Sequence, residues 1–400
     1  MKILMIVKYP PIQGGVSTES YWTAQTFAEM GHEVHVLTNA DEIEEQYRIK
    51  IPPQDMHLLA GYKIKGKIFL HKTEKDSNHV FIPQNNPSVS KIVGTGLKVI
   101  KEFNPAFIWS YYLEPYGVSA LFLSLLTGVP YVIKHAGSDI GRLMPTAQLM
   151  PIYKEVFQRA LFVITHSVHF DRFRLLGVKV TNFSESISNR FRGDLFFPEP
   201  PQEKKMVTIG VYGKTGHSKG TYEILKAIGL LRSQGVPCVL KACWDKKNVD
   251  IICRYAETLS LGEDVFQWID FMPHWRMPDF IKSCDMILFL ENNFRIRFHT
   301  PGIPIEVLAC GRPIITTSEI ADKKFLATFL KPKENAFLIS KEKVDSETIA
   351  EAIHTVINHV SGTDFWRTPW VNSGLLSFKA RLKTEEFLNV IQDRINFSKA

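Results

Sequence analysis

The sequence predicts an α/β protein made of two Rossmann-like domains that face an interdomain cleft. The chain has 400 residues, more than the roughly 250 to 300 that a single hydrophobic core supports. A glycine followed at once by an apolar strand recurs at residues 31–38, 128–134, 235–241 and 311–317. A short apolar run, a glycine loop and a helix also follow one another twice, from residues 2 and 206. The second of these runs indicates that the fold starts again.

Each of the four glycine junctions marks the end of a helix and the start of a strand. Glycine readily adopts the left-handed conformation that closes a helix, and a nearby proline prevents the helix from continuing. Strands that alternate with helices form parallel sheets, which are covered on both faces. The expected strands are residues 2–8, 31–38, 131–134, 206–212, 313–317 and 336–340, and the expected helices are 21–30, 221–232, 305–310 and one capped by Ser346.

A stretch rich in proline, with one glycine, lies between the two strand–loop–helix successions that start at residues 2 and 206, and it sets the domain boundaries. We expect an N-terminal domain over residues 1–190, a linker over 191–205 and a C-terminal domain over 206–364. Residues 365–400 have a helical pattern and are expected to pack back toward the N-terminal domain.

Composition narrows the function classes. The five cysteines are odd in number and form no CxxC pair, which favours a reducing compartment and no metal site. No export signal and no membrane-spanning run are expected. The net charge of +7 fits an anionic substrate, an anionic membrane surface or nucleic acid, and does not choose among them. Residues 63–72 are basic and apolar, which predicts a solvated hairpin or loop, with interfacial membrane contact as the alternative.

Two glycine loops are candidate anion sites because each follows a strand. Gly14 and Gly15 precede a helix, where backbone N–H groups attract a phosphate, although turns use glycine for other reasons too. The second loop begins at Gly213 and carries Lys214 and Lys219, whose ammonium groups could contact one diphosphate, with a solvated basic loop as the alternative. This loop is neither a Walker loop nor GxGxxG.

Three further polar side chains lie after a predicted strand or at a predicted helix start. His135 and Asp139 follow the strand at residues 131–134, so they are expected at the cleft edge, where a satisfied structural role is the alternative. Glu306 begins a helix, either as a ligand or as an acid that complements the helix dipole.

Taken in order, these motifs resemble the retaining, nucleotide-sugar-dependent glycosyltransferases of family four, which have the GT-B fold. The resemblance rests on Gly14-Gly15, Leu113 to Gly117, His135 to Asp139, Ser188-Asn189, Gly213 to Gly220, Glu306 to Pro313 and Glu334 to Ser340. It implies a donor nucleotide on the C-terminal domain and an acceptor on the N-terminal one. It also implies catalysis with no metal and no other cofactor.

The resemblance assigns roles residue by residue. Glu306 resembles the acid that binds the ribose hydroxyls, Lys214 and Lys219 the diphosphate ligands, and His135 the histidine beside the transferred sugar. The family pattern often has a second acid eight positions before the ribose-binding one, and this chain has Phe298 there. The loop residues His299, Thr300 and Gly302 are therefore expected to contact the donor sugar instead.

The expected partners are a nucleotide-sugar donor and a glycan, lipid-linked or small-molecule hydroxyl acceptor, with no nucleic acid. The expected location is the cytoplasm, including the inner face of the membrane if the acceptor is lipid-linked. An NAD-dependent oxidoreductase is the first alternative, which the missing GxGxxG spacing disfavours. A non-catalytic sugar-nucleotide or nucleic-acid binder is the second, and only the basic charge supports it.

Overall fold

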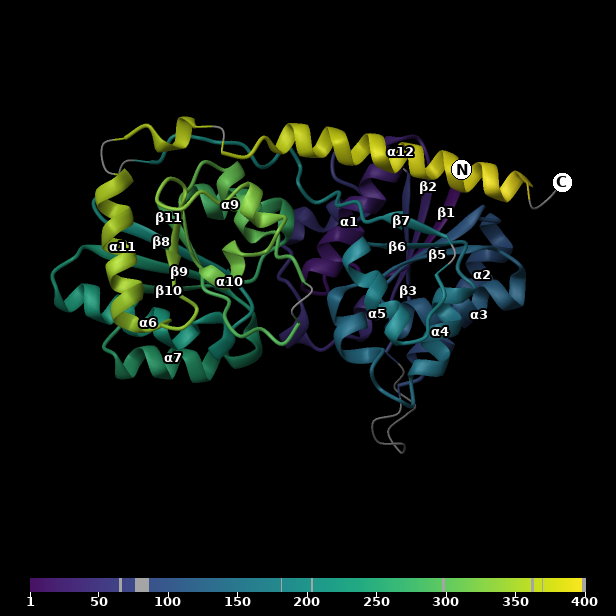
Figure 1. The fold of residues 1–400 in the computed structure, drawn as a ribbon, viewed down its shortest axis with the longest axis horizontal. Helices are drawn as coiled ribbons and strands as arrows, with labels where there is room; N and C mark the ends of the chain where they lie inside the picture. The colour runs from purple at the N-terminus through teal and green to yellow at the C-terminus, as the bar shows by residue number, and fades with distance from the viewer. Residues whose placement is uncertain are drawn as a thin grey trace.

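The computed structural model describes residues 1–64, 67–75, 86–180, 182–202, 204–296, 299–360, 363–368 and 370–397. Within these residues the chain forms two α/β lobes that lie side by side (Figure 1). Each lobe has a parallel sheet with helices on its faces, as predicted. Among the helices described, none is long and apolar enough to cross a membrane.

The N-terminal lobe contains a sheet whose described strands have the order β3-β2-β1-β4-β5-β6-β7. Strand β1 shows why this sheet is buried on both sides. Its residues alternate between two hydrophobic clusters, with Ile3 and Met5 in one and Leu4 and Ile6 in the other, since successive side chains point to opposite faces. The elements are β1 (Lys2–Val7), α1 (Gly15–Glu29), β2 (Glu33–Thr38), β3 (Ile68–Lys72), α2 (Ser88–Phe103), β4 (Phe107–Tyr111), α3 (Val118–Thr127), β5 (Tyr131–Lys134), α4 (Met150–Gln158), β6 (Phe162–Thr165), α5 (Phe170–Leu175) and β7 (Phe183–Glu185).

The C-terminal lobe repeats the plan, with described strands in the order β10-β9-β8-β11-β12-β13. Its first strand, β8, lies in the middle of the sheet, as β1 does in the other lobe. The elements are β8 (Val207–Gly213), α6 (Thr221–Ser233), β9 (Cys238–Trp244), α7 (Val249–Thr258), β10 (Phe266–Asp270), α8 (Met277–Lys282), β11 (Met286–Phe289), α9 (Ile303–Ala309), β12 (Ile314–Thr317), α10 (Ser318–Ala321), β13 (Ala336–Ile339) and α11 (Ser346–Val360).

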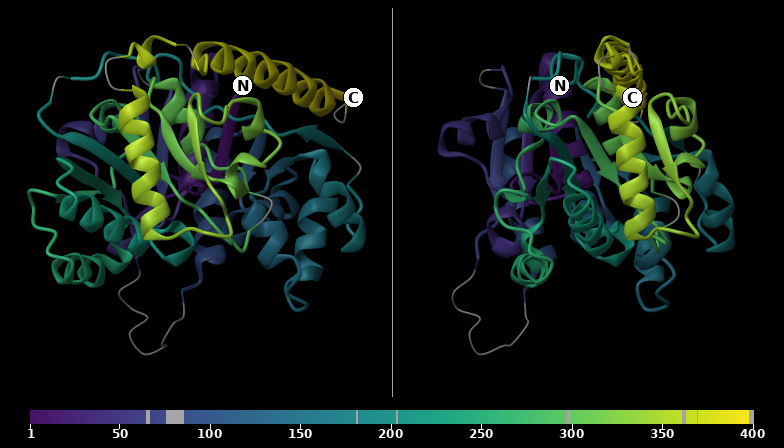
Figure 2. Two further views of the ribbon diagram at one scale, coloured as in Figure 1. Left: turned by 60° about the vertical axis from the view of Figure 1, so that its left-hand side comes forward. Right: turned by 90° about the vertical axis from the view of Figure 1, so that its left-hand side faces the viewer.

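The last helix, α12 (Ser373–Phe397), leaves the C-terminal lobe and runs along the N-terminal one (Figure 1). In the turned views of Figure 2 it stays on the outside of the molecule. Its Phe387 contacts Trp109 and Phe162, with ring centroids 6.2 and 5.4 Å away. The C-terminal residues therefore complete the hydrophobic core of the N-terminal lobe.

Local predictions are confirmed at the helix ends and fail at two other places. Gly31, Gly128, Gly235 and Gly311 all have positive φ, between 67° and 92°, as helix-closing glycines should. Residues 68–72, expected in a hairpin or loop, instead form the edge strand β3, which pairs in parallel with β2. Ser346 does not cap α11, because Asp345 accepts the hydrogen bond from the amide of Thr348 at 2.8 Å. Edge pairing depends on a neighbouring strand that a local pattern does not reveal, whereas the capping error was a choice between two adjacent residues that can both cap a helix.

Direct contacts between the lobes fix the position of the cleft. Asp55, in the turn Pro53–Ala60, accepts two hydrogen bonds from the guanidinium of Arg276, at 2.7 and 2.6 Å, and a third from Trp275 at 3.0 Å. The aromatic ring of Tyr21 lies 4.9 Å from that of Trp275. One buried hydrophobic cluster consequently continues from the N-terminal lobe into the C-terminal lobe.

Candidate active site

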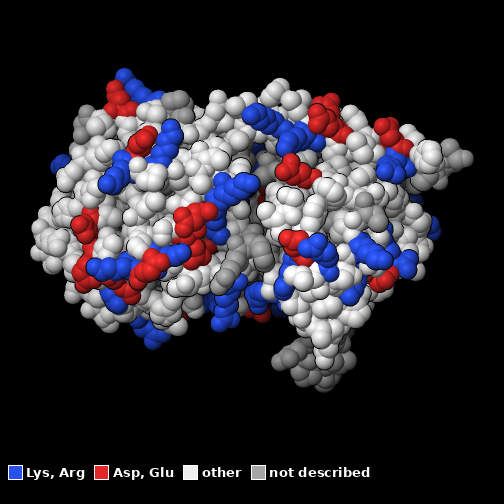
Figure 3. All heavy atoms as spheres, in the orientation of Figure 1, with Lys and Arg blue, Asp and Glu red and all other residues white. Residues whose placement is uncertain are grey.

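A cleft of about 310 Å³ lies where the carboxyl ends of the two sheets face each other. Both lobes contribute to its lining. Lys and Arg side chains lie along the junction of the lobes on the face shown in Figure 3. Nine of the sequence-predicted residues line the cleft: Gly14, Gly15, Gly213, Lys214, Lys219, His299, Thr300, Gly302 and Glu306. The structure thus brings together residues from three separate motifs.

The N-terminal wall of the cleft is the start of helix α1. Gly14 precedes the helix with φ 112°, a conformation that other residues adopt only with strain. The first amides of a helix have no partner within it and attract anions. The hydroxyl of Ser17, which also lines the cleft, is buried without a hydrogen-bond partner in the described part of the chain. This wall therefore offers unsatisfied polar groups to a ligand.

The opposite wall is the glycine loop that follows β8. Gly213, Gly216 and Gly220 all have positive φ, and Asp245 holds the loop by accepting hydrogen bonds from the amide and hydroxyl of Thr215, at 3.1 and 2.8 Å. The loop presents Lys214 at its exposed edge. Within the described residues, no acid lies in ion-pair distance of Lys214. Its charge is available to an anion.

Lys8 brings another cation toward the same place. It follows strand β1, and its Nζ lies 3.7 Å from the position that a Cβ on Gly14 would take. Burial, and to a lesser extent the ammonium of Lys214, lower the pKa of Lys8 to about 8. The two ammonium groups repel each other, and an anion placed between them would offset this repulsion.

Glu306 lies in the first turn of α9, and its carboxylate is only 1% exposed. Arg190, in the segment between β7 and β8, donates to Oε1. His274 donates to the same oxygen at 3.0 Å, and the Tyr212 hydroxyl donates to Oε2 at 2.8 Å. Burial alone would raise the pKa of Glu306, but Arg190 and His274 outweigh it and hold the pKa below its usual range. A carboxylate oxygen accepts about two hydrogen bonds, so only Oε2 has a place left for a ribose hydroxyl.

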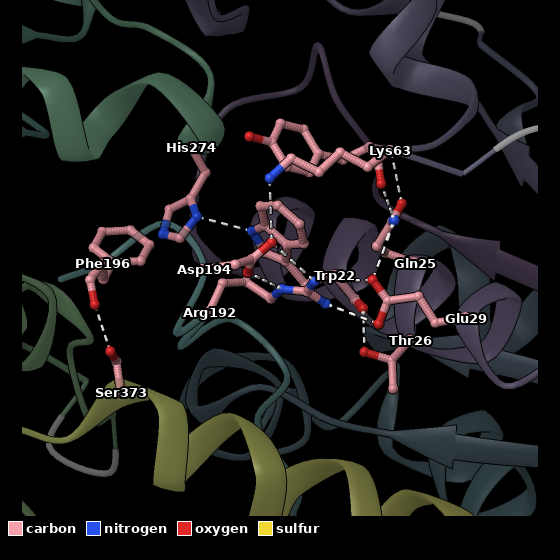
Figure 4. A network of polar contacts seen from close by, with 11 residues as sticks. Trp22, Gln25, Thr26, Glu29, Lys63, Arg192, Asp194, Phe196, His274 and Ser373 are labelled. Carbon is pink, nitrogen blue, oxygen red and sulfur yellow. Dashed lines mark hydrogen bonds and ion pairs between the residues drawn. The ribbon is translucent and has the colours of Figure 1, made fainter.

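His274 connects Glu306 to the N-terminal lobe, as Figure 4 shows in part. Trp22 of α1 donates from Nε1 to His274 Nδ1 at 2.8 Å. Because Nδ1 accepts, the ring hydrogen is on Nε2 and is donated to Glu306. Burial lowers the pKa of His274, although Glu306 opposes this shift. A neutral histidine with a fixed tautomer therefore orients the acid from across the interface.

Arg190 occupies the space between the two walls. Its Nη1 lies 3.6 Å from the position that a Cβ on Gly15 would take, and a Cβ on Gly302 would lie only 2.5 Å from its Cζ. A larger residue at position 302 would displace the guanidinium. Glycine at this position thus permits Arg190 to approach the start of α9.

Lys219, unlike Lys214, is already paired. Its ammonium contacts the buried carboxylate of Glu291 and lies 3.9 Å from the centroid of the Phe294 ring. His299 is also close to Glu291, with 3.1 Å between Nε2 and Oε1. The pKa of Glu291 lies below its usual range, because the contacts with His299 and Lys219 outweigh the effect of burial. Phe298, where the family pattern often has an acid, lies outside the described residues.

His135 and Asp139 follow β5 but do not belong to the cleft lining. The imidazole of His135 is hydrogen-bonded through Nε2 to the Thr165 hydroxyl at 2.7 Å and packs against Phe157 and Phe173. Burial lowers its pKa to about 3. Asp139 accepts hydrogen bonds from the amides of Ala136 and Leu113, at 2.7 and 3.3 Å, and burial raises its pKa to about 7. In this structure both residues hold the loop after β5.

The residues of the site that were not found from the sequence include Lys8, Ser17, Arg190, Tyr212, His274 and Glu291. Tyr212 and Glu291 stand at the carboxyl ends of β8 and β11, where the rule that identified Lys214 would also have selected them. Arg190 and His274 lie in irregular segments without a motif. Only their contact with Glu306 reveals them.

Comparisons with known proteins concern the fold and one part of the chain. Residues 194–360 match the family model of the group 1 glycosyl transferases. The structure resembles that of HepE from Anabaena in complex with UDP and glucose, at 15% identity and a TM-score of 0.65, covering 98% of this chain and 99% of that one. It also resembles a glycosyltransferase from Rickettsia africae, at 12% identity and a TM-score of 0.60, covering 98% of each chain.

A third similar structure is a UDP-N-acetylglucosamine 2-epimerase, described as putative, from Listeria monocytogenes, at 10% identity and a TM-score of 0.59, covering 100% of this chain and 97% of that one. Among curated proteins, none matches the chain significantly. The two facing parallel-sheet lobes and the similar structures together give the conclusion that the chain has the GT-B fold, within which residues 194–360 match the model of the group 1 glycosyl transferases.

Proposed function

We propose that this protein is a retaining glycosyltransferase that moves a sugar from a nucleotide-diphosphate sugar to a hydroxyl acceptor. The observation that carries the proposal is the meeting of Lys214, the start of α1 and Glu306 around one cleft between the lobes. A diphosphate needs cations and free amides, and a ribose needs an acceptor for its hydroxyls. The glycosyltransferase domain in residues 194–360 supports the same chemistry.

The charged groups of the cleft support one orientation of the donor. The nucleotide lies against the C-terminal lobe with its ribose at Glu306, and the diphosphate lies between Lys214, Lys219 and the amides after Gly14. The sugar then extends toward His299, Thr300 and Gly302. HepE from Anabaena has been observed with UDP and with UDP-glucose, which makes uridine nucleotides the first donors to test.

In the proposed reaction the acceptor hydroxyl forms a bond to the anomeric carbon on the same face from which the diphosphate departs. The bond between the anomeric carbon and the phosphate oxygen breaks, and the acceptor proton passes to the departing diphosphate. Fixed cations stabilise the charge that develops on the leaving group. The reaction as proposed needs no metal and no protein nucleophile. His135 is proposed to contact the transferred sugar when the donor is bound, with Asp139 holding its loop.

The acceptor is proposed to bind the N-terminal lobe. A glycan, a lipid-linked sugar or a small molecule with a free hydroxyl would suit a cytoplasmic enzyme of glycan, polysaccharide or glycolipid synthesis. The net charge of +7 would favour an acceptor at an anionic membrane surface.

A ligand screen followed by product analysis tests the proposal. We expect UDP, GDP or ADP to raise the melting temperature, because a ligand that binds only the folded state stabilises it. With the selected nucleotide sugar and an acceptor mixture, ¹H NMR should show a product with the donor's anomeric configuration, with or without EDTA. Inverted configuration would refute retention. If the protein binds the reduced nicotinamide cofactor and binds no nucleoside diphosphate, the oxidoreductase alternative would be favoured.

A further inference from the structure

Glu291 lies two residues beyond strand β11, and its side chain is fully buried, with 0% exposure. It nevertheless belongs to the lining of the cleft. Burying a carboxylate is costly unless it is paired and hydrogen-bonded. Hydrophobic packing therefore does not explain why a glutamate is buried at this position.

The two oxygens of Glu291 differ in how well they are satisfied. Oε2 accepts a hydrogen bond from the ammonium of Lys219. Oε1 lies 3.1 Å from His299 Nε2, but it accepts no hydrogen bond from any described residue. A buried acceptor without a donor costs free energy, so a ligand hydroxyl in the cleft would find a favourable partner here.

The neighbours of Glu291 indicate which part of a donor would reach it. Lys219 is the proposed ligand of the diphosphate, and Glu291 contacts the same ammonium. The sugar of a nucleotide-diphosphate sugar is bonded directly to the distal phosphate. A group that touches the phosphate-binding lysine is therefore close to the first sugar ring. His299, expected from the sequence to contact that ring, stands on the other side of Glu291.

We propose that Glu291 accepts hydrogen bonds from the hydroxyls of the transferred sugar and so provides the acid that position 298 lacks. The inference rests on the proposed glycosyltransferase function. It specifies the substrate class, because a buried carboxylate favours a neutral, hydroxyl-bearing hexose and disfavours a sugar that carries its own carboxylate. A donor without the contacted hydroxyl would leave the buried oxygen unpaired and bind worse.

The test compares a nucleoside diphosphate with its sugar in the wild type and in Glu291→Gln. The probes are UDP and UDP-glucose, or the pair GDP and GDP-mannose if the thermal screen selects guanosine. We expect Glu291→Gln to leave the Kd for the nucleoside diphosphate within about threefold, and to weaken the nucleotide sugar by about tenfold to a hundredfold. The matched control is Glu223→Gln, which breaks an exposed lysine pair at 3.0 Å in the same lobe and should change neither affinity.

Equal changes for the nucleoside diphosphate and its sugar would overturn the inference, because Glu291 would then act only as the counter-ion of Lys219. Circular dichroism establishes whether the variant folds. If it does not, wild-type protein decides the question: UDP-glucose should bind more tightly than UDP-glucuronic acid, and equal or reversed affinity would overturn the inference. Failure of the wild type to bind any nucleoside diphosphate would instead overturn the proposed function, and the inference with it.

Discussion

Arg190, in the segment between β7 and β8, is ion-paired with Glu306 at the start of α9. The pair joins the segment between the lobes to the acid proposed to bind the ribose. Arg190 is 16% exposed and Glu306 is 1% exposed at the side chain, so solvent screens their attraction little. Donor binding must accommodate this guanidinium, either beside the ribose or displaced from it.

Replacing Arg190 with Met should destabilise the protein. Among the described residues, the substitution leaves the buried carboxylate with His274 and Tyr212 as donors. Removing one partner of a buried pair costs about 3 to 5 kcal/mol. Urea unfolding at pH 7 measures this loss. In a double-mutant cycle with Glu306→Gln, the double variant should lose less than the sum of the single variants. Additive losses would show that the two residues are not energetically coupled.

Replacing Lys214 with Ala should weaken nucleoside diphosphate binding by about tenfold to a hundredfold, the effect of one lost charge-assisted hydrogen bond. Because Lys214 is exposed and unpaired among the described residues, the fold should be unaffected. Lys219→Ala should cause a similar loss in affinity and also lower the melting temperature, since Glu291 then loses its cation. Lys226→Ala, which removes an exposed partner of Glu223, is the control. Normal affinity in both cleft variants would refute the phosphate assignment.

The affinity for a nucleoside diphosphate should fall as the pH rises through about 8. The pKa of Lys8 is lowered to about 8, so its ammonium is present below that pH and lost above it. The ligand's phosphate charge is constant there, since its last pKa is about 6. Calorimetry from pH 6.5 to 9.5 should show a loss of about tenfold. Lys8→Arg should remove the dependence, because guanidinium stays charged, whereas Lys2→Arg, at the far end of the strand that precedes Lys8, should leave it unchanged.

Replacing His135 with Ala should lower kcat while leaving nucleoside diphosphate affinity intact. The expected loss is about tenfold to a hundredfold, corresponding to one hydrogen bond made in the transition state. Thr165→Val removes the hydroxyl that is hydrogen-bonded to the imidazole at 2.7 Å. This variant separates a role of His135 in the reaction from a role in holding the loop. If both variants lower only the melting temperature and kcat is retained, His135 serves the loop rather than the reaction.

Short-range patterns predicted much of this molecule. A glycine that closes a helix and an apolar run that enters a sheet are properties of a few consecutive residues, so Gly31, Gly128 and Gly311 could be placed correctly. Lys214 and Gly15 could be assigned to one site because each follows the first strand of its own sheet, and two Rossmann-like domains in tandem present the carboxyl ends of their strands to one cleft. Both predictions needed no knowledge of distant contacts.

The contacts around Glu306 and Glu291 could not be predicted in the same way. Arg190 and Glu306 are 116 positions apart, and Lys219 and Glu291 are 72 apart. The first pair depends on how the segment between β7 and β8 lies against the C-terminal lobe, and the second on β8 and β11 being neighbours in one sheet. The sequence motif also suggested a free ribose-binding acid at Glu306, whereas the folded chain surrounds that acid with donors. Tertiary placement determines how many lone pairs remain for a ligand.

Helix α12 makes the N-terminal lobe discontinuous along the chain. The two crossings between the lobes touch, because a Cβ on Gly193 would lie 2.5 Å from the Cα of Gly374 and Ser373 donates to the Phe196 carbonyl. In topological terms the C-terminal lobe is an insertion whose two ends lie together. It could therefore be excised as a continuous fragment or replaced by another lobe. A single cut at the linker would instead separate the N-terminal lobe from the helix that covers Trp109 and Phe162.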